Sequence, residues 1–420
     1  MKKLFFAIGC LSLLAWSFAQ QTPAQMRAIG VDTAAAEIPL DEIMSGGPPP
    51  NGIPAIGFTG DWQGAAGATQ APAFVTQEVA ADWLEPQEPV IALTLNGESK
   101  AYPLQILTWH EIVNDTLGGV PVAVTFCPLC NSALAFDRRI PLTEETQKTL
   151  TDLNEEAAPE PVAEDFAAAY ALQNGESEVA AELEVTFGVS GMLYNSNMLM
   201  FDTTTSTLWS QLLGDGSVGT LSGTRLLRYP AQIVSFAEFR EAFPEAAVLS
   251  RDTGSDRRYG QNPYLGYDNA DTPAFLFSGE ADDRLAPKER VLSIDAPGES
   301  VAYPFSVLEQ ANVVNDEVGT TPVAIFWEAG TTSALDEGSI AESRDVGAVG
   351  VFERTVEGQV LTFTWNGEAF TDEETGSTWN ILGVATEGEL AGTRLTPVVH
   401  DNTLWFAWAA FKPDTRIYQN

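Results

Sequence analysis

Two cysteines separated by two residues are the strongest chemical feature of the sequence. Cys127 and Cys130, with proline and leucine between them, follow an apolar run at residues 121–126 that predicts a buried strand. The chain has only two histidines, His110 and His400. Thiolate and imidazole groups together can bind a metal ion, whereas two neighbouring thiols alone can cycle between a dithiol and a disulfide.

In the metal interpretation, the Cys-Pro-Leu-Cys turn presents two thiolates to one ion. Proline restricts the turn, and the following Asn131 tolerates the left-handed backbone conformation that such a turn requires. A closed site usually has four ligands, so the two histidines are the candidates that would complete it. Because thiolate and imidazole ligands suit copper or zinc, we expect a copper or zinc site formed by Cys127, Cys130, His110 and His400.

Two other interpretations of the cysteine pair stay open. In a thiol-disulfide oxidoreductase, the first cysteine often lies at the N-terminus of a helix, which lowers its pKa. Residues 133–137 predict a strand, so the sequence disfavours a thioredoxin-type arrangement but allows a dithiol in a loop. In the third interpretation the cysteines are inert, and the chain is a non-catalytic structural or ligand-binding module.

The N-terminus predicts export from the cytoplasm. Two lysines precede an apolar run at residues 4–16, and small residues at Ser17 and Ala19 form a cleavage site. We therefore expect residues 1–19 to be a signal peptide and the mature protein to be periplasmic or extracellular. No other segment is apolar enough to span a bilayer, so we expect no transmembrane segment in the mature chain.

The composition is strongly acidic. The 420 residues include 58 Asp and Glu against 21 Lys and Arg, a formal net charge of −37. Such a charge repels nucleic acid and anionic lipid, so we expect no nucleic-acid partner. The length allows two or three domains. The composition leaves the partner as an unidentified protein or small molecule.

Short motifs recur along the chain in the same order. Ala-Tyr-Pro, Val-Asn-Asp and Pro-Val-Ala begin at residues 101, 113 and 121 and again at residues 302, 314 and 322. Ser-Ala-Leu at residues 132 and 333 keeps the same offset, and Gly-Thr-Arg-Leu follows at residues 223 and 392. We infer two tandem diverged repeats, residues 83–286 and 287–420. The shorter second offset indicates an acidic insertion at about residues 141–183 of the first repeat.

The two repeats differ at the positions of the candidate ligands. His110 corresponds to Ala311 and Cys127 to Glu328, whereas His400 of the second repeat corresponds to an alanine in the first. The candidate ligands are therefore divided unequally, so that one repeat could hold the site while the other closes it. The insertion is rich in Ala and Glu, and we expect a solvated loop or a loose acidic helix there.

Hairpin signals dominate the pattern of elements. Residues 90–95 predict a strand, and Asn96 and Gly97 predict a tight turn into a return strand. A short helix is expected within residues 104–112. We predict an α+β fold with mainly antiparallel β-sheet and short helices, in which the two repeats form a pseudo-symmetric unit.

Two further segments have local signals. Ser235 followed by Glu238 forms a capping box that predicts a helix over residues 236–243. Residues 20–82 are rich in Gly, Pro and Ala, so we expect a segment that wraps the surface or is partly disordered.

A polar stretch at residues 186–197 is the remaining candidate for a site. Ser190 lies between glycines, but the spacing is not that of a nucleophile elbow. Asn195, Ser196 and Asn197 either line a polar pocket or cap strands and turns, and we favour turns.

Several long motifs resemble, in the same order, those of the bacterial and archaeal domain of unknown function family 3179. They are Trp-His-Glu-Ile-Val-Asn-Asp at residues 109–115 and the stretches at residues 125–132, 187–195, 209–211 and 400–408. The resemblance covers residues 82–420. Asn131 stands where relatives often have glycine, and the long insertion departs from a compact form. Since the family has no established function, the resemblance implies a fold unit and export but no reaction.

Overall fold

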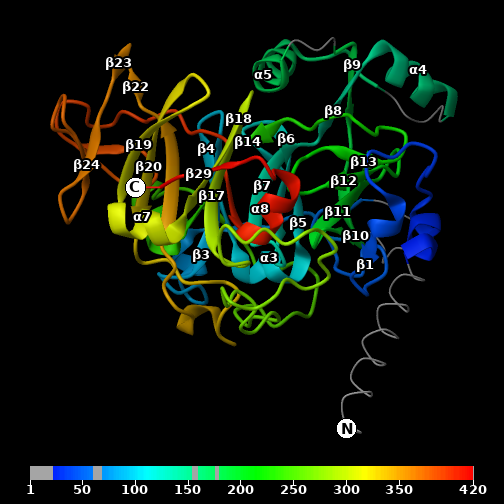
Figure 1. Cartoon of the computed structure of the whole chain (residues 1–420), viewed down its shortest axis with the longest axis horizontal. Coiled ribbons are helices and arrows are strands. Elements are labelled where there is room, and N and C mark those ends of the chain that lie inside the picture. Colours follow the sequence, from blue (N-terminus) through cyan, green and yellow to red (C-terminus); the bar gives the residue numbers. More distant parts are fainter. Residues whose placement is uncertain (1–21, 60–68, 154–158, 176–178, 420) are drawn as a thin grey trace, which may run out of the picture.

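The computed structural model describes residues 22–59, 69–153, 159–175 and 179–419 (Figure 1). The predicted signal peptide lies outside these residues. Most strand pairs are antiparallel and the helices are short, so the predicted α+β class with mainly antiparallel sheet is confirmed. In the part of the chain that the structure describes, no helix has both the length and the apolar character needed to cross a membrane.

The first half of the chain forms two sheets joined through a short helix. Its elements are β2 (Phe74–Val75), α2 (Gln77–Ala80), β3 (Pro89–Leu95), β4 (Glu98–Pro103), α3 (Leu104–His110), β5 (Ile112–Leu117), β6 (Val120–Cys127), β7 (Ser132–Asp137), β14 (Arg228–Tyr229), β15 (Ala231–Ser235), α6 (Phe236–Ala242) and β16 (Ala247–Leu249). One sheet has the order β15-β3-β4-β16-β2, and the other has the order β14-β7-β6-β5. The β5-β6-β7 meander brings the end of β6 into the interior, where the cysteine pair begins.

Local signals produce the predicted local structure. Asn96 and Gly97 have φ angles of 49° and 82°, which a two-residue hairpin turn with the twist of the flanking strands requires. Helix α3 ends where Glu111 adopts a φ of 59°. At α6 the Ser235 hydroxyl accepts from the Glu238 N–H, and the Glu238 carboxylate accepts from the Ser235 N–H, which confirms the capping box.

The second half has the same order of elements. It contains β17 (Arg290–Ala296), β18 (Glu299–Pro304), α7 (Phe305–Ala311), β19 (Val313–Val318), β20 (Thr321–Glu328), η2 (Ile340–Glu342), β21 (Ala348–Glu353), β28 (Asp401–Leu404), α8 (Trp405–Phe411) and β29 (Arg416–Ile417). Its sheets have the orders β28-β17-β18-β29 and β19-β20-β21. A hairpin, a short helix and a second hairpin therefore follow one another in both halves.

One long-range contact occurs in both halves. The tyrosine of each Ala-Tyr-Pro motif donates to the aspartate of each Val-Asn-Asp motif, Tyr102 to Asp115 at 2.8 Å and Tyr303 to Asp316 at 2.7 Å. Both tyrosine rings are buried. The recurring motifs thus hold the first hairpin of each half against the second.

The halves differ in the connection after β6 and after β20. A short turn links β6 to β7, whereas β20 ends at Glu328 and pairs there with Ala348 across a long connection. The Ser-Ala-Leu match at residues 132 and 333 is therefore wrong as a structural equivalence. Ser132 begins β7, but Ala334 and Leu335 lie in the long connection and pack into the core of the first half.

Two smaller sheets complete the architecture. The first contains β1 (Met44–Ser45), β10 (Phe187–Tyr194), β11 (Asn197–Asp202), β12 (Leu208–Ser210) and β13 (Gly216–Val218), in that order. The second contains β24 (Phe363–Trp365), β25 (Phe370–Asp372), β26 (Thr378–Trp379) and β27 (Ala385–Glu387). The strand pair β22 (Thr355–Val356) and β23 (Gln359–Val360) lies at one edge of the molecule, as Figure 1 shows.

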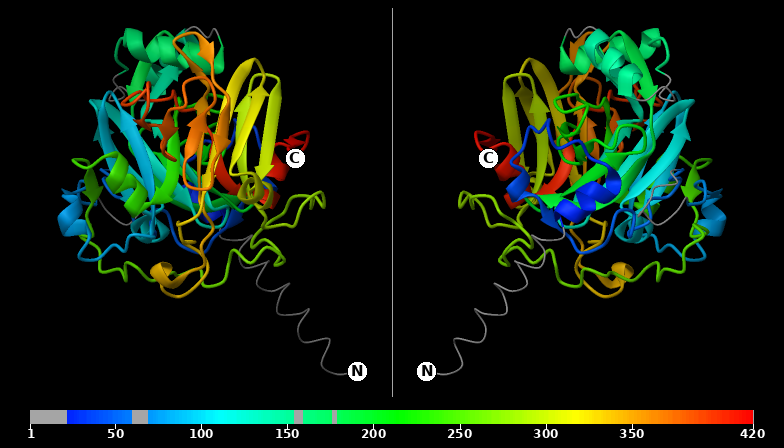
Figure 2. Two further views of the ribbon diagram at one scale, coloured as in Figure 1. Left: turned by 90° about the vertical axis from the view of Figure 1, so that its left-hand side faces the viewer. Right: turned by 90° about the vertical axis from the view of Figure 1, so that its right-hand side faces the viewer.

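The two halves share their cores. Leu404 and Phe406 of the second half pack in the same cluster as Cys127 and Cys130, and β28 lies against β7. Figures 1 and 2 show the strands of the first half, in cyan and green, side by side with those of the second half, in yellow and orange. Because this cluster is continuous across both halves, each half covers part of the apolar surface of the other.

The acidic insertion is more ordered than the sequence predicts. Strands β8 (Arg139–Leu142) and β9 (Ala181–Glu184) pair at its base, and α4 (Glu144–Leu153) and α5 (Glu164–Asn174) lie between them at the edge of the molecule (Figure 1). Phe166 and Tyr170 of α5 are buried and pack with Leu227. The expectation of a solvated insertion is wrong for α5, because its two aromatic residues dock it on the body.

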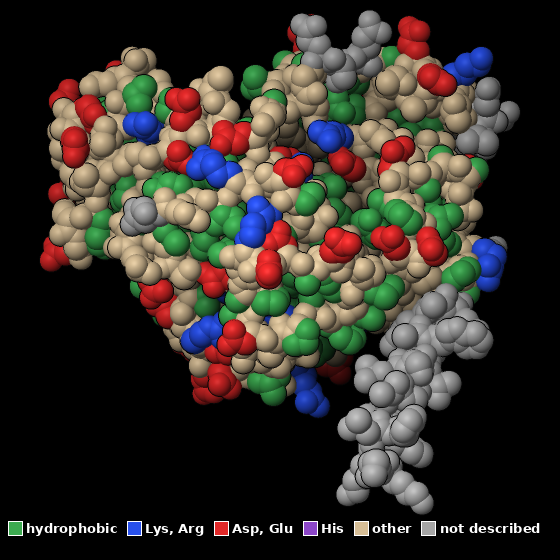
Figure 3. Space-filling view, in the orientation of Figure 1, with side chains coloured by type: hydrophobic (Ala, Val, Ile, Leu, Met, Phe, Trp, Pro, Cys, Tyr) green, Lys and Arg blue, Asp and Glu red, His purple; other side chains and the backbone are tan. Residues whose placement is uncertain are grey.

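The segment before β3 wraps the body and contributes to its core. Strand β1 pairs with β10 and β2 pairs with β16, while Ala55, Ile56 and Phe58 are buried. The outer surface reflects the composition: in Figure 3, Asp and Glu side chains are scattered over the face shown and basic side chains are fewer.

Candidate functional site

The cysteine motif is the turn between β6 and β7. Cys127 is the last residue of β6 and lies opposite Ser132, the first residue of β7. The N–H of Cys130 donates to the carbonyl of Cys127 at 3.2 Å, and Asn131 has a φ of 53°. This is the left-handed conformation that the sequence analysis expects after the motif. A strand follows the motif, so the thiols do not lie at a helix N-terminus.

Both thiols are buried and point at one acceptor. Cys127 is 1% exposed and Cys130 is 0% exposed, and neither is in a disulfide. The carbonyl oxygen of Ser196 lies 3.9 Å from the sulfur of Cys127 and 3.5 Å from that of Cys130, and it accepts from both. Burial, followed by the contact with Cys127, raises the pKa of Cys130 well above its usual range. Cys130 is therefore held as a thiol.

An amide network supports the sulfur of Cys130. The Nδ2 group of Asn197 lies 3.7 Å from this sulfur and donates to Oε1 of Gln211 at 3.0 Å. Gln211 in turn donates to the Thr125 hydroxyl, also at 3.0 Å. All four side chains are buried. The network holds one N–H donor at the sulfur, and such a donor favours a thiolate over a thiol.

The β10–β11 turn supplies the shared acceptor. Asn195 and Ser196 have φ angles of 48° and 67°, so the segment is a tight turn, as the sequence analysis favours. The same turn also lines the thiol site, because it directs the Ser196 carbonyl at both sulfurs. The two interpretations of this polar stretch therefore both hold. Ser190 donates to the Leu199 carbonyl inside the sheet and has no place in the site.

The connection between the halves covers the thiols. The Tyr267 hydroxyl donates to the Leu129 carbonyl at 2.9 Å, and the Ser196 hydroxyl donates to the Phe275 carbonyl. These contacts fasten the connection over the tip of the β6–β7 hairpin. The thiols are consequently shielded from solvent, since their exposure is nearly zero.

A buried carboxyl lies behind this cover. The Tyr264 hydroxyl lies 3.4 Å from Oε1 of Glu111, and burial raises the pKa of Glu111 to about 8. Cys127 also acts electrostatically on Tyr264 and raises its pKa further, after burial and Glu111. Tyr264 therefore lies close enough to both the carboxyl and the first thiol to interact with them electrostatically.

The second half closes the site through β28. The N–H of Leu404 and the hydroxyl of Thr403 donate to the Cys130 carbonyl, at 2.8 Å and 3.0 Å. The carboxylate of Asp401 accepts from the Ser132 hydroxyl at 2.6 Å. Burial raises the pKa of Asp401 to about 6. The turn is thus fixed by a strand that lies roughly 270 residues away in the sequence.

His110 has no free ring nitrogen. Its Nδ1 lies 2.6 Å from the Pro54 carbonyl and its Nε2 lies 2.6 Å from the Tyr259 hydroxyl. A carbonyl only accepts, so Nδ1 carries the proton and Nε2 accepts from the tyrosine. Burial lowers the pKa of His110 to about 4. The ring is a neutral, hydrogen-bonded residue of the interior.

His400 is also neutral and lies outside the thiol site. Its Nδ1 faces the Val398 carbonyl at 2.8 Å, and its Nε2 is buried without a partner among the described residues. Burial lowers its pKa to about 4, and the charge of Arg228 lowers it further. His400 therefore lies near that arginine, whereas its neighbour Asp401 contacts the cysteine hairpin.

The predicted four-ligand site is not assembled. Cys127 and Cys130 lie together, but neither histidine joins them, and the described part of the chain contains no group of three or more His, Cys, Asp and Glu placed to hold a metal ion. The donors that do converge are two thiols and the carbonyl of Ser196. This set fits a soft ion with few ligands better than it fits zinc.

Sequence reasoning missed several residues of the site. Gln211, Tyr264, Tyr267 and Asp401 carry no local pattern that points to the thiols. Gln211 and Asp401 do occur in the stretches that resemble the family, which was the only signal available for them. Both tyrosines lie in an irregular connection, where neither periodicity nor spacing indicates a partner.

The fold and the site together define an α+β protein with a buried vicinal dithiol at the tip of a β-hairpin. The family model described as "Protein of unknown function (DUF3179)" matches residues 50–415, and the chain belongs to this family. The family resemblance inferred from the motifs is thereby confirmed. No curated protein and no solved structure matches the chain.

Proposed function

We propose that this protein binds a copper ion in its reduced, monovalent form through Cys127 and Cys130. The observation that carries the proposal is the convergence of two buried free thiols on one carbonyl oxygen. Thiolates are soft ligands and select soft ions such as Cu⁺. Zinc, the alternative from the sequence, would need two more ligands, and both histidines are engaged elsewhere or point away.

The electrostatics around the thiols favour a bound cation over a free thiolate. No Lys, Arg or His side chain is among the hydrogen-bond partners of the two sulfurs in the described residues. Reactive free thiolates usually sit beside such a cation or a helix N-terminus. An ion in the site would supply the positive charge itself and deprotonate both thiols, with the Ser196 carbonyl dipole directed at it. Asn197 and Gln211 would orient the ligand sulfur of Cys130.

The site supports metal holding, as in a carrier or a storage protein. The thiols are covered by the connection between the halves, and the ligand turn is fixed by β28. A closed ligand set with a movable cover retains an ion and releases it when the cover opens. The proposal includes export to the periplasm or beyond, supported by the basic start and apolar run of residues 1–19.

We also propose that the two halves are diverged tandem repeats. The shared order of elements, the ordered motifs and the recurring Tyr–Asp contact support this. In this proposal the first repeat carries the ligands and the second repeat closes the site through β28.

The test is anaerobic titration of the reduced, purified mature protein with Cu⁺, in competition with a chromogenic Cu⁺ chelator. About one equivalent should bind. Cys127→Ser and Cys130→Ser should each weaken binding at least about 100-fold, since they remove a ligand. Glu328→Gln changes the equivalent strand end of the second half and is the matched control, with wild-type binding expected.

A further variant separates ligation from simple loss of folding. Asn197→Ala removes the N–H at the sulfur and should weaken Cu⁺ binding about 10-fold to 100-fold, the usual range for such support. Thermal unfolding followed by circular dichroism establishes that each variant is folded. Absence of Cu⁺ binding in the wild type, or wild-type binding in the folded double cysteine variant, would contradict the proposal.

A second candidate function is thiol-disulfide oxidoreductase chemistry. The contact between the two thiols favours it, because two adjacent thiols can form a disulfide. In this reaction the dithiol loses two electrons and two protons to a disulfide oxidant and becomes a disulfide. Thiol trapping in buffers of graded redox potential tests it: a reversible midpoint above about −300 mV supports this function. A pair that never oxidises excludes it.

A further inference from the structure

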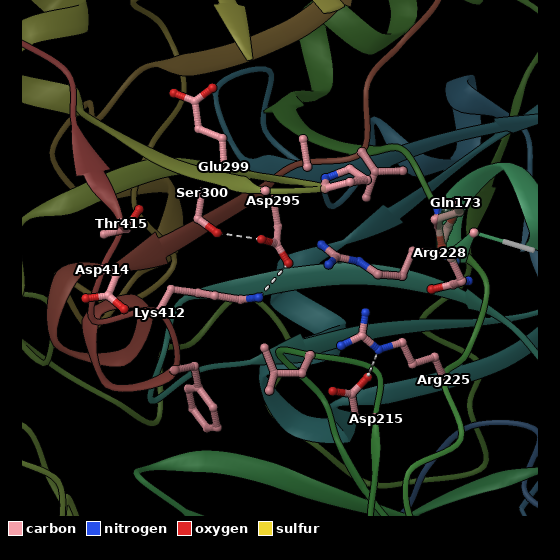
Figure 4. A pocket seen from close by; sticks show the side chains of 18 of the residues that line it. Gln173, Asp215, Arg225, Arg228, Asp295, Glu299, Ser300, Lys412, Asp414 and Thr415 are labelled. Atoms are coloured by element: carbon pink, nitrogen blue, oxygen red, sulfur yellow. Dashed lines mark hydrogen bonds and ion pairs between the residues drawn. The ribbon is translucent and has the colours of Figure 1, made fainter. Parts of the chain in front are cut away.

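A separate hollow opens where the two halves and the insertion meet. Its volume is about 750 Å³, within the range of small-molecule sites (Figure 4). The end of α5, the β17–β18 turn and the C-terminal segment after α8 line it, together with residues 213–228. Leu213, Val399 and Phe411 give it apolar surface. None of its lining residues contacts the thiols.

Most charges in this hollow are paired. Three carboxylates each have a cation: Asp215 has Arg225 at 3.2 Å, Asp295 has Lys412 at 2.7 Å, and Glu299 has Arg416 at 2.8 Å. Ser300 also donates to Asp295, as Figure 4 shows. The lining holds four basic and four acidic side chains, so the charge of the hollow is balanced in a chain that has 21 basic residues against 58 acidic ones.

Two charged lining residues, Arg228 and Asp414, have no ion pair with another described residue. The Arg228 side chain points into the hollow toward Asp295 in Figure 4, yet no hydrogen bond with another described residue reaches its guanidinium. Its Nε atom is buried without a partner. Asp401, Asp295 and Asp215 lie near enough to act on it electrostatically but not within ion-pair distance. A partly buried guanidinium whose Nε has no partner is costly unless a ligand satisfies it.

The insertion holds this arginine in place. Oε1 of Gln173, in α5, accepts from the Arg228 N–H at 2.8 Å, and Nε2 of the same residue donates to the Arg228 carbonyl at 3.0 Å. Both backbone groups of Arg228 are therefore bound by one side chain. The docked helix α5 thus fixes the position from which the guanidinium enters the hollow.

We propose that this hollow binds a small organic carboxylate, whose carboxylate group pairs with Arg228 and whose apolar part rests on Leu213, Val399 and Phe411. A guanidinium presents a planar fork of donors that matches a carboxylate in two parallel hydrogen bonds. The apolar lining distinguishes this ligand class from a bare inorganic oxyanion, which would leave that surface wet. The proposal is independent of the metal proposal, because it uses none of the residues at the thiols.

The test is isothermal titration calorimetry of the mature protein with benzoate, with its neutral isostere benzamide and with inorganic phosphate. Benzoate should bind, and its affinity should fall as salt is raised, while benzamide and phosphate should bind at least about tenfold more weakly. Arg228→Gln should lower benzoate affinity about tenfold or more. Arg228→Lys keeps the charge but loses the fork, so its affinity should lie between those of wild type and Arg228→Gln.

Arg394→Gln is the matched control, because Arg394 is the arginine of the second Gly-Thr-Arg-Leu motif, packs on Phe243 and lies outside the hollow. It should bind benzoate as wild type does, and thermal unfolding verifies the fold of every variant. Equal binding of benzoate and benzamide, tighter binding of phosphate than of benzoate, undiminished binding by folded Arg228→Gln, or no binding of any probe would each overturn the proposal.

Discussion

The end of β6 and the end of β20 occupy the same place in the two halves but carry different chemistry. In the first half, the buried thiol of Cys127 lies there, beneath a closing connection and next to a strand of the other half. In the second half, Glu328 lies there, half-buried, and its pKa is raised to about 7 by burial and then by Glu238 and Glu241. A long connection replaces the short cysteine turn. The shared arrangement of strands therefore does not determine the chemistry of the site. The side chains at the strand end determine it.

The difference also shows what a site requires beyond its ligands. The cysteine turn accepts hydrogen bonds from β28 and from the connection between the halves, and it donates to the β10–β11 turn. At the second strand end, four glutamates line a surface hollow instead. Buried polar groups with many partners are rigid and specific, whereas a half-open acidic cluster remains hydrated. Four measurements would break or sharpen this comparison.

The largest loss of folding stability is expected for a Trp–Asp contact that both halves share. Trp209 donates to Asp202 at 3.0 Å and Trp379 donates to Asp372 at 2.9 Å, and both indoles are buried. Replacing either tryptophan with phenylalanine should lower the free energy of unfolding by about 3 kcal/mol, from lost packing and the loss of the hydrogen bond to the aspartate. Urea denaturation measures both. A loss in only one half would show that the shared contact is not energetically equivalent.

The next effect concerns Glu111, behind the thiol site. Its folded pKa of about 8 lies above the ordinary value of 4.5, so the folded state retains a proton that the unfolded state has lost. The contribution of Glu111 to the free energy of unfolding is therefore largest below pH 4.5. It declines by on the order of 3 kcal/mol as pH rises toward 8. Glu111→Gln should flatten this decline, as measured by denaturation at a series of pH values. An unchanged pH profile would contradict a buried, protonated Glu111.

Asp401 should give a smaller effect in a lower pH window. Burial raises its folded pKa from 3.8 to about 6, so its contribution to stability is lost as pH rises between these values. Asp401→Asn should remove on the order of 2 kcal/mol of that dependence. It also weakens the acceptor for Ser132, so the thiols of this variant should react faster with a thiol reagent. Equal thiol reactivity would show that β28 does not control access.

The smallest effect is expected at Glu328, the counterpart of Cys127. Its raised pKa of about 7 predicts stability that declines between pH 4.5 and 7, and partial exposure limits the change to about 1 kcal/mol. Glu328→Gln should relieve this decline in pH-dependent unfolding and leave the first half unaffected. If it altered thiol reactivity, the two strand ends would be coupled rather than independent.

Much of the fold was predictable from residues close together in the sequence. The turn at Asn96 and Gly97, the capping box at Ser235 and the left-handed Asn131 depend on a few neighbouring backbone groups, and each forms as expected. The recurring tripeptides also indicated the shared order of elements. The Ser-Ala-Leu match misled because three small or apolar residues carry too little information to fix a strand.

The sequence alone could not predict where the histidines lie, which segment covers the thiols, or that a hollow forms at Arg228. The His110 ring meets the Tyr259 hydroxyl, and the Thr403 hydroxyl meets the Cys130 carbonyl, across long chain separations. No local pattern encodes such meetings, because they result from packing one apolar core shared by both halves. The residue types limited the available chemistry to thiols and imidazoles, and burial and long-range hydrogen bonds then kept the thiols together and held the imidazoles apart.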